Sequence, residues 1–418
     1  MHELYQLDNK ANIVLIPQDN THSVTVLVVY PVGSRYESKK MNGVSHYIEH
    51  LMFKGTKKRK NTLILTREID RLGAEYNAFT SKENTGYYIK TDCNYVEKSL
   101  DILSDMLYNS IFDPKEMERE KPVIVEELRM YKDNPIMNID NVFEELMYSG
   151  PLGWDIGGTE ENVMNFERTD VLAYKKKYYD PSNATVVVAG HINENIKKLI
   201  EKYFGQEKSQ FKPSKSFKPF GYGDDARDSR LKVERKSTDQ VQMILGFPGF
   251  EYNDNQNPIA SVMNNILGGS MSSRLFIQIR ERRGLAYSIS SGTENFRDTG
   301  YMHISAGLEA KNINKAIVVV KQELEKLIDK GVTDQELKDA KTNFRGRMSL
   351  AMENSSTVAS FYAKQALFAR KIKSPEELLK ETEGVTQDQI QKLAKKVYNT
   401  NKMRVAIIGD VDASQVIF

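Results

Sequence analysis

The chain has 418 residues, which is too long for one ordinary domain and predicts two or three. Hydrophobic residues make up 40% of it and charged residues 28%, values that are normal for a globular protein. The 59 Lys and Arg residues nearly balance the 57 Asp and Glu residues, so the chain lacks the basic field that attracts nucleic acids or anionic membranes.

The beginning of the chain shows no positively charged region followed by an apolar run, so we expect no secretory signal. The longest apolar runs, such as VTVLVVY at residues 24–30, have the length of a strand and are too short to cross a bilayer. Cys93 is the single cysteine, which excludes a disulfide within the chain and fits a reducing compartment. We therefore expect a cytoplasmic protein with no membrane partner.

The stretch NGVSHYIEHLMFKGT, residues 42–56, predicts a helix over residues 44–54 that ends at Gly55. Its apolar side chains recur at the i, i+3, i+4, i+7 and i+8 positions of one face, namely Val44, Tyr47, Ile48, Leu51 and Met52. On the opposite face, His46 and His50 lie one turn apart, about 6 Å along the axis, so their imidazoles can converge on one metal ion. A histidine on a polar helix face is usually only solvated, but here a glutamate stands between the two.

Glu49 lies beside His50 and is rotated away from the line that the two histidines share, so it can reach a water on the metal more easily than it can become an equal ligand. The pattern H-x-x-E-H is the inverse of the commoner zinc motif H-E-x-x-H. Zinc held by two histidines and a carboxylate, with one position open for water, is the arrangement of a catalytic site. The pattern therefore requires a third ligand elsewhere in the chain.

An acidic helix is predicted at residues 113–133, DPKEMEREKPVIVEELRMYKD, with Asp113 as its N-cap. Glu120 and Glu127 are seven residues apart, so they share a face but lie about 10 Å apart along it, and one ion cannot bind both. Glu126 points about 100° away from Glu127 and remains an alternative ligand. Pro122 lies in the interior and should kink the helix.

The two halves of the chain carry similar patterns. NATVVVAGHIN at residues 183–193 is similar to KMRVAIIGDVD at residues 402–412, about 220 residues later. Similarly, VTVLVVYPVGSRYE and VQMILGFPGFEYND are each a strand that runs into a turn with proline and glycine. We expect two similar domains, residues 1–205 and 231–418, joined by a polar linker at residues 206–230. Runs of strand and helix within each half favour an α+β fold.

GVSHYIEHLMFKGT resembles the pitrilysin family of zinc peptidases, the inverzincins, and in particular its small-subunit branch of mitochondrial processing peptidases and short bacterial relatives. The resemblance covers the whole chain. It implies two tandem homologous domains, each with a mainly antiparallel sheet packed with helices. It also implies that Glu127 is the third zinc ligand, beside His46 and His50, and that Glu120 is a supporting carboxylate.

Two further stretches match the family. LGAEYNAFTSKENTGYY, residues 72–88, is similar to its exposed edge strand, which pairs with the substrate backbone, and implies substrate contacts by Asn77, Ala78 and Thr80. SSRLFIQIRERRGLAYSISSG, residues 272–292, matches the pattern in which an arginine and a tyrosine hold the substrate, here Arg280 and Tyr287. Spacing alone would not have selected this pair.

The resemblance and the motif together predict a metalloendopeptidase that uses one zinc ion per chain to cleave unfolded peptides. Glu49 takes a proton from the attacking water and delivers it to the leaving amine. We expect a homodimeric clamshell, because the family encloses its substrate between two halves of two domains each. Two alternatives are a narrowly specific presequence-processing peptidase and a non-catalytic partner subunit, although the complete zinc motif argues against the second.

Overall fold

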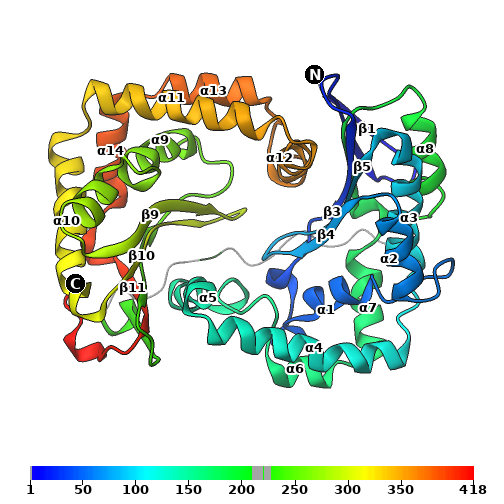
Figure 1. Cartoon of the computed structure of the whole chain (residues 1–418), viewed down its shortest axis with the longest axis horizontal. Helices are drawn as coiled ribbons and strands as arrows, with labels where there is room; N and C mark the ends of the chain where they lie inside the picture. Colours follow the sequence, from blue (N-terminus) through cyan, green and yellow to red (C-terminus); the bar gives the residue numbers. More distant parts are fainter. Residues whose placement is uncertain (1, 210–219, 221–226) are drawn as a thin grey trace. The chain divides into compact units, whose positions relative to one another are not determined.

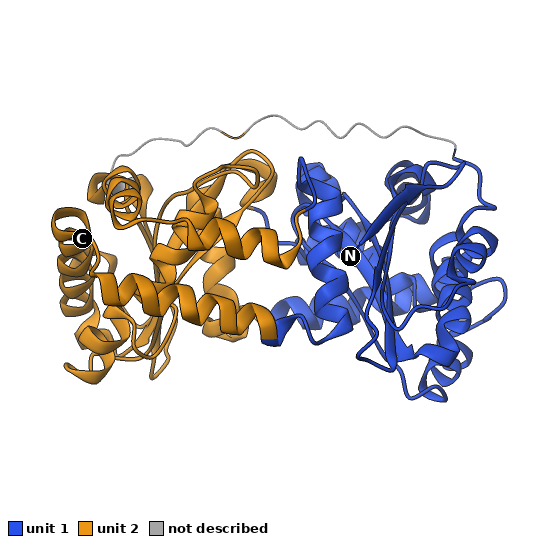
Figure 2. Ribbon diagram, turned by 90° about the horizontal axis from the view of Figure 1, so that it is seen from above, with its two compact units in different colours: residues 1–129, 154–218, 350–372 blue, residues 130–153, 219–349, 373–418 orange. Residues whose placement is uncertain are grey.

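The computed structural model describes residues 2–209, 220 and 227–418, and it divides into two compact units (Figures 1 and 2). Unit 1 comprises Met1–Arg129, Trp154–Lys218 and Leu350–Ile372; unit 2 comprises Met130–Gly153, Pro219–Ser349 and Lys373–Phe418. Each predicted domain supplies most of one unit, and each unit also takes one segment from the other half of the sequence. Most of the predicted linker lies outside the described residues.

Unit 1 is built on a six-stranded sheet. In spatial order its strands are β1 (Glu3–Gln6), β2 (Asn12–Pro17), β6 (Thr185–Gly190), β3 (Ser23–Tyr30), β5 (Thr85–Asp92) and β4 (Glu75–Thr80). All neighbouring strands are antiparallel except β2 and β6. The helices of this unit are α1 (Val44–Leu51), α2 (Thr62–Asp70), α3 (Val96–Asn109), α4 (Pro114–Asp133), α6 (Glu160–Asn165), α7 (Arg168–Tyr178), α8 (Ile196–Phe204) and α12 (Ser355–Phe368).

Unit 2 repeats this plan with a five-stranded sheet. Its strands are, in spatial order, β7 (Leu231–Arg235), β11 (Arg404–Gly409), β8 (Val241–Pro248), β10 (Gly300–Leu308) and β9 (Ala286–Asn295). Only β7 and β11 are parallel. Its helices are α5 (Pro135–Met147), α9 (Asn257–Gly268), α10 (Ile313–Lys330), α11 (Asp334–Ala351), α13 (Pro375–Glu383) and α14 (Gln387–Val397).

The two sheets share one strand order, because β7, β11, β8, β10 and β9 follow one another as β2, β6, β3, β5 and β4 do. The two pairs of similar sequences that indicated a repeat occupy equivalent places: they form β6 and β3 in one sheet, and β11 and β8 in the other. The predicted fold class, two homologous α+β domains with mainly antiparallel sheets, is confirmed.

Both faces of each sheet are covered, which explains why the central strands are continuous apolar runs. In β3, Val26 and Val28 point into the core that contains α1 and α3, whereas Leu27 and Val29 pack against α12. In unit 2, α5 covers the corresponding face of the sheet, and its Phe143 packs with residues of β8 and β11. In the described part of the chain, no helix is both long and apolar enough to cross a membrane.

Candidate metal centre

Helix α1 presents the two histidines. It begins at Val44 and ends at Leu51, three residues before the predicted end, and Met52–Lys54 continue it as a tighter turn. The predicted apolar face is buried: Val44, Tyr47, Ile48, Leu51 and Met52 are each at most 1% exposed. This burial fixes the rotation of α1 about its own axis, and the opposite face turns His46 and His50 toward α4.

The ring nitrogens of the two histidines converge with a carboxylate of α4. His46 Nε2 lies 3.3 Å from His50 Nε2. Glu127 Oε1 is 3.7 Å from His46 Nε2, and Glu127 Oε2 is 3.3 Å from His50 Nε2. Among the described residues, these three are the group whose candidate ligand atoms all lie within 4.8 Å of one another.

The geometry of this group fits zinc. Two nitrogens bound at about 2.05 Å in tetrahedral geometry lie about 3.3 Å apart, and the two Nε2 atoms have this separation. Two imidazoles and one carboxylate are also the donor set of a catalytic zinc site that keeps a fourth position open. His46 and Glu127 retain 15% and 27% side-chain exposure, so a water or a substrate can reach the centre.

The charges of the group also favour a cation. Burial and the charge on His50 lower the pKa of His46. Burial alone would lower the pKa of His50 too, but its hydrogen bonds to Glu120 and Glu127 outweigh burial and raise it. The carboxylates therefore favour a positive charge between them, which is the electrostatic demand that a divalent cation satisfies.

Glu120 orients one of the ligands. Its Oε1 lies 2.9 Å from His50 Nδ1, and its Oε2 pairs with Lys54, one turn beyond His50. Burial acts to raise the pKa of Glu120, but the hydrogen bonds from His50 and Lys54 hold it below its usual value. A carboxylate on the second ring nitrogen fixes the tautomer and the orientation of a metal-binding histidine. Sequence reasoning missed Lys54, although its place four residues after His50 was visible.

Helix α4 runs from Pro114 to Asp133 without interruption, and Pro122 lies inside it. Glu120 and Glu127 share the face that meets α1. The alternative ligand Glu126 is turned to solvent, where it pairs with Arg129 at 2.8 Å and its side chain is 71% exposed. Glu126 is therefore not part of the ligand group.

Glu49 lies next to the group and is held by strand β4. Its Oε2 accepts a hydrogen bond from Thr80 Oγ1 at 2.5 Å. Burial raises the pKa of Glu49, although the bond from Thr80 opposes the shift. Sequence analysis assigned Thr80 to substrate binding, and the structure adds that it orients the proposed base. Asn77 and Ala78 lie on the same strand, which is the edge of the sheet.

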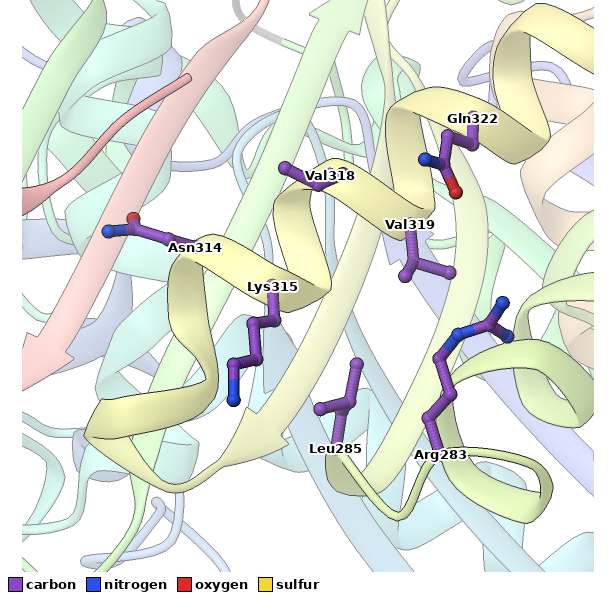
Figure 3. A pocket seen from close by; sticks show the side chains of 7 residues that line it. All are labelled: Arg283, Leu285, Asn314, Lys315, Val318, Val319 and Gln322. Carbon is purple, nitrogen blue, oxygen red and sulfur yellow. The ribbon is translucent and has the colours of Figure 1, made fainter.

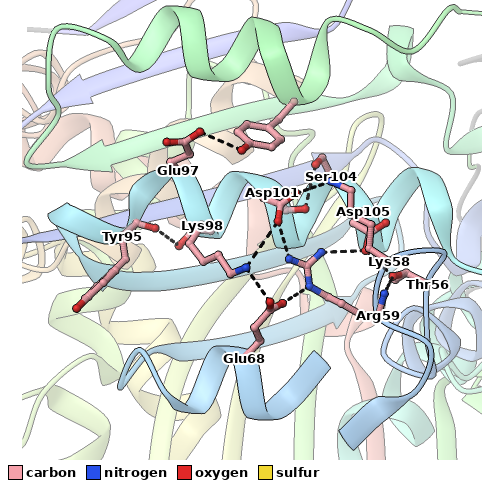
Figure 4. Close-up of polar contacts among 12 residues, drawn as sticks. Thr56, Lys58, Arg59, Glu68, Tyr95, Glu97, Lys98, Asp101, Ser104 and Asp105 are labelled. Carbon is pink, nitrogen blue, oxygen red and sulfur yellow. Dashed lines mark hydrogen bonds and ion pairs between the residues drawn. The ribbon is translucent and has the colours of Figure 1, made fainter. Parts of the chain in front are cut away.

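A buried ionic cluster fixes the turn that follows α1 (Figure 4). Arg59 donates to Asp101 at 2.6 Å and to Asp105 at 2.9 Å, and it also pairs with Glu68. Its side chain is only 4% exposed. Because Asp101 and Asp105 lie on α3 and Glu68 lies on α2, the cluster attaches the end of the histidine helix to two neighbouring helices.

Arg280 and Tyr287 lie together in unit 2. The guanidinium of Arg280, in the π-helical turn Phe276–Glu281, is 5.3 Å from the centre of the Tyr287 ring. Tyr287 is 70% exposed and occupies a bulge near the start of the edge strand β9. The exposed Tyr287 ring is thus on the edge strand, and the partly buried Arg280 lies beside it in the preceding turn.

Unit 2 also has a groove of about 600 Å³ (Figure 3). Its lining comes from the turn after Arg280 and from α10, namely Arg283, Leu285, Asn314, Lys315, Val318, Val319 and Gln322. None of these side chains is a carboxylate or an imidazole, so the groove lacks the donor types that form the group on α1 and α4.

An H-x-x-E-H helix opposite a glutamate is the arrangement of a mononuclear zinc centre. Comparison with known proteins agrees with this. Residues 13–160 match the family model described as insulinase (peptidase family M16), and residues 165–344 match the one described as peptidase M16 inactive domain. The chain belongs to peptidase family M16, as its resemblance to the pitrilysin family predicted.

Related proteins are named zinc proteases. The chain is 34% identical over 410 residues to the uncharacterized zinc protease YmxG of Bacillus subtilis, and the match covers 98% of each chain. It is 31% identical to the uncharacterized zinc protease SCO5738 of Streptomyces coelicolor, with 95% of this chain and 87% of that protein covered.

Solved structures show the same fold. A protease from Helicobacter pylori superposes with a TM-score of 0.91 at 24% identity, covering 98% of this chain and 99% of that one. A peptidase M16 inactive domain from Pseudomonas fluorescens superposes with a TM-score of 0.87 at 17% identity and covers 99% of both chains.

Proposed function

We propose that this protein is a zinc metalloendopeptidase that hydrolyses unfolded peptides. The observation that carries the proposal is the convergence of His46, His50 and Glu127 at distances that suit zinc, with Glu49 on the same helix as the two histidines. The names of the relatives, zinc proteases, support it.

In this proposal His46, His50 and Glu127 hold the ion, and zinc bound there supplies Lewis acidity that activates water and polarises the scissile carbonyl. Glu49 takes a proton from the attacking water and gives it to the leaving amine. Its raised pKa suits a group that must both accept and release a proton. Thr80 keeps the Glu49 carboxylate in place during the transfer.

The substrate is proposed to bind as an added strand on β4, with its backbone along Asn77 and Ala78. β4 is the edge of its sheet, so one row of its backbone N–H and C=O groups is open to such pairing. Main-chain hydrogen bonds give affinity without much sequence preference, so cleavage should be broad and should require an unfolded peptide.

A direct test uses purified protein and a library of disordered peptides, with and without a chelator. We expect cleavage at many positions, loss of cleavage with the chelator, and recovery when about one zinc per chain is restored. Compact folded proteins should remain intact. Cleavage that resists complete metal removal would exclude the mechanism, and efficient cleavage of a stable folded domain would exclude strand addition.

The proposal extends to a homodimer in which the zinc centre of one chain works with Arg280 and Tyr287 of the other. Mixing equal amounts of Glu49→Gln and Arg280→Ala chains tests it. Half the dimers are then mixed, and each mixed dimer has one site with both lesions and one site with none, so activity recovers to roughly a quarter of wild type. No recovery after verified subunit exchange would exclude the shared site.

A further inference from the structure

The helix that carries the histidines lacks a cap of its own. α1 has only eight residues, and its N-cap is Gly43, which has no side chain to accept a hydrogen bond from the first turn. Gly43 has φ +99°, and a Cβ there would lie 2.4 Å from the carbonyl oxygen of Gly157, so a capping side chain cannot be placed at this position.

Glu37 supplies the missing acceptor from a preceding segment. Its Oε2 accepts from Gly43 N at 2.8 Å and from Asn42 Nδ2 at 3.1 Å, and its Oε1 accepts from Ser45 N at 2.8 Å. His46 is the next residue after Ser45. A carboxylate at a helix N-terminus also interacts favourably with the helix dipole. Both oxygens of Glu37 therefore bind the turn that presents the first proposed ligand.

The segment that carries Glu37 is attached to the hairpin between β4 and β5. Ser34 N and Arg35 N donate to the carbonyl oxygens of Ser81 and Lys82 at 3.1 and 2.8 Å. The Arg35 guanidinium forms a buried ion pair with Glu83 at 2.7 Å. Since Thr80, which holds Glu49, directly precedes this hairpin, Glu37 links α1 to the strand that orients the proposed base.

A second connection leads from Glu37 to α4. Asn42, which donates to Glu37, also donates to the carbonyl oxygen of Asp155 at 2.9 Å. The loop that begins at Asp155 packs on α4, because a Cβ on Gly157 would lie 2.5 Å from Leu128, the neighbour of Glu127. Through Arg35 and Asn42, the segment around Glu37 is thus connected to all three elements that form the centre, namely α1, α4 and β4.

Glu37 occupies this place at an electrostatic cost. It is 4% exposed, and its partners in these bonds are N–H groups rather than a cation. Burial raises its pKa to about 7 even though the N–H groups of Ser45 and Gly43 act to lower it. Removing a charge from water without a counterion is unfavourable, and the three hydrogen bonds from Gly43, Ser45 and Asn42 offset only part of this cost.

We propose that Glu37 is a positioning residue of the metal centre: its carboxylate sets the placement of the first turn of α1, and so of His46, relative to Glu127. This inference rests on the proposed function, because it assumes that the group of His46, His50 and Glu127 holds a metal ion. Glu37 itself touches neither the ion nor the substrate. Its removal should alter how the metal is held before it alters whether the protein folds.

The test compares metal binding in wild type, Glu37→Gln and Glu323→Gln. Glutamine has nearly the same shape as glutamate, but its NH₂ group must face either Ser45 N or the pair formed by Gly43 N and Asn42, and two donors cannot bond. Glu323 is a buried glutamate of unit 2, paired with Lys326 at 2.7 Å, so its variant controls for the loss of any buried carboxylate.

For Glu37→Gln we expect a zinc affinity at least tenfold weaker, measured by competition with a chromophoric chelator, and a changed visible spectrum of the Co²⁺-substituted protein. Glu323→Gln should keep the wild-type affinity and spectrum. Unchanged affinity and spectrum in Glu37→Gln, whatever its melting temperature, would show that Glu37 is only structural and overturn the inference.

Should Glu37→Gln fail to fold, Glu37→Asp serves in its place, because it keeps the charge but is one methylene too short to reach Gly43 N and Ser45 N together. It should weaken zinc binding and shift the Co²⁺ spectrum in the same direction, and wild-type behaviour would again overturn the inference. Failure of the proposed function is a separate result: wild-type protein would then bind no stoichiometric zinc or cobalt.

Discussion

The two units place a similar helix beside the edge strand of their sheet, but only one of these helices carries metal ligands. In unit 1, α1 packs near β4, and in unit 2, α9 packs near β9. When the two helices are aligned, their buried apolar positions coincide: Tyr47, Ile48, Leu51 and Met52 correspond to Val262, Met263, Ile266 and Leu267. The polar positions between them differ completely.

In that alignment the candidate metal ligands and the candidate base of α1 correspond to neutral polar residues of α9: His46, Glu49 and His50 align with Ser261, Asn264 and Asn265. The contact with the edge strand is nevertheless retained. Asn264 Nδ2 donates to Thr293 of β9 at 3.2 Å, much as Thr80 of β4 donates to Glu49. Unit 2 thus keeps a polar contact between this helix and the edge strand without the acid–base chemistry.

The ligand helix differs in the same way. When α4 and α11 are aligned at their N-caps, Asp113 and Thr333, Glu127 of α4 corresponds to Arg347 of α11. Each of these two residues lies fourteen positions after its N-cap. An arginine cannot bind zinc and carries the opposite charge. The comparison teaches that the apolar positions maintain the fold while a few polar positions decide whether it holds a metal. The inactive-domain model that matches residues 165–344 agrees with this.

The largest effect should follow from Glu49→Gln. Without a group that accepts the proton of water, turnover should fall by about 10³-fold or more, while zinc content stays at the wild-type level. The matched control is Glu126→Gln, the same substitution at an exposed carboxylate of α4. Steady-state cleavage of a quenched fluorescent peptide measures both. A Glu49→Gln protein with normal turnover would mean that the chemistry does not take place at α1.

The next largest effect, on zinc affinity, distinguishes α4 from its counterpart α11. Glu127→Gln should weaken zinc binding by at least the 10–100-fold that loss of a supporting partner costs, because it removes a direct anionic ligand. Arg347→Gln, at the equivalent position of α11, should leave zinc affinity unchanged. Elemental analysis and chelator competition report both values. Equal losses in the two variants would contradict the assignment of one metal centre to unit 1.

Much of the site could be predicted from sequence because it depends on short-range spacing. The positions of His46, Glu49 and His50 on one helix follow from the helical repeat alone. The choice of Glu127 over Glu126 came from the family resemblance, because α4 and α1 are far apart in sequence. Glu37 was missed, since a long-range contact of an ordinary charged residue leaves no local pattern. Lys54 was missed because its spacing from His50 does not indicate its distant partner, Glu120.

The repeat and the strands were also readable, but the exchange of helices was not. Apolar periodicity indicates that a helix has a buried face and does not say which sheet it packs against. Thus α5 follows α4 in the chain yet packs on the sheet of unit 2, and α12 follows α11 yet packs on the sheet of unit 1. The choice depends on tertiary contacts with central strands of the other half of the sequence.

Two buried groups, Glu37 in unit 1 and His303 in unit 2, should contribute to stability with opposite dependence on pH. Burial raises the pKa of Glu37 to about 7 from 4.5, so the folded state binds more protons between these values and this contribution to stability declines as pH rises toward 7. Burial lowers the pKa of His303 in β10 below 6.5, although Asp140 opposes the shift, so this contribution increases as pH rises toward 6.5.

Urea unfolding of metal-free protein between pH 5 and about 7 tests this through the difference in unfolding free energy between wild type and each variant. The difference in unfolding free energy between wild type and Glu37→Gln should fall as the pH rises. The difference between wild type and His303→Gln should increase, and each should change by at most about 1.4 kcal/mol per pH unit. Differences that are flat, or that share one sign, would contradict the opposed contributions.

The smallest effect tests whether α5 packs on the sheet of unit 2 and not on that of unit 1. Ile139 of α5 is 6% exposed in the core that this helix forms with β8 and β11, whereas Ile136 on the same helix is 66% exposed. Ile139→Val should therefore lower the free energy of unfolding by about 0.5–1.5 kcal/mol, and Ile136→Val should change it little. Because the lost methyl group contacts unit 2 alone, zinc affinity in unit 1 should not change in either variant. Chemical denaturation and chelator competition measure the two quantities. If Ile139→Val lowered zinc affinity together with the free energy of unfolding, the packing of α5 would also stabilise the metal-binding unit, which would contradict its assignment to unit 2 alone.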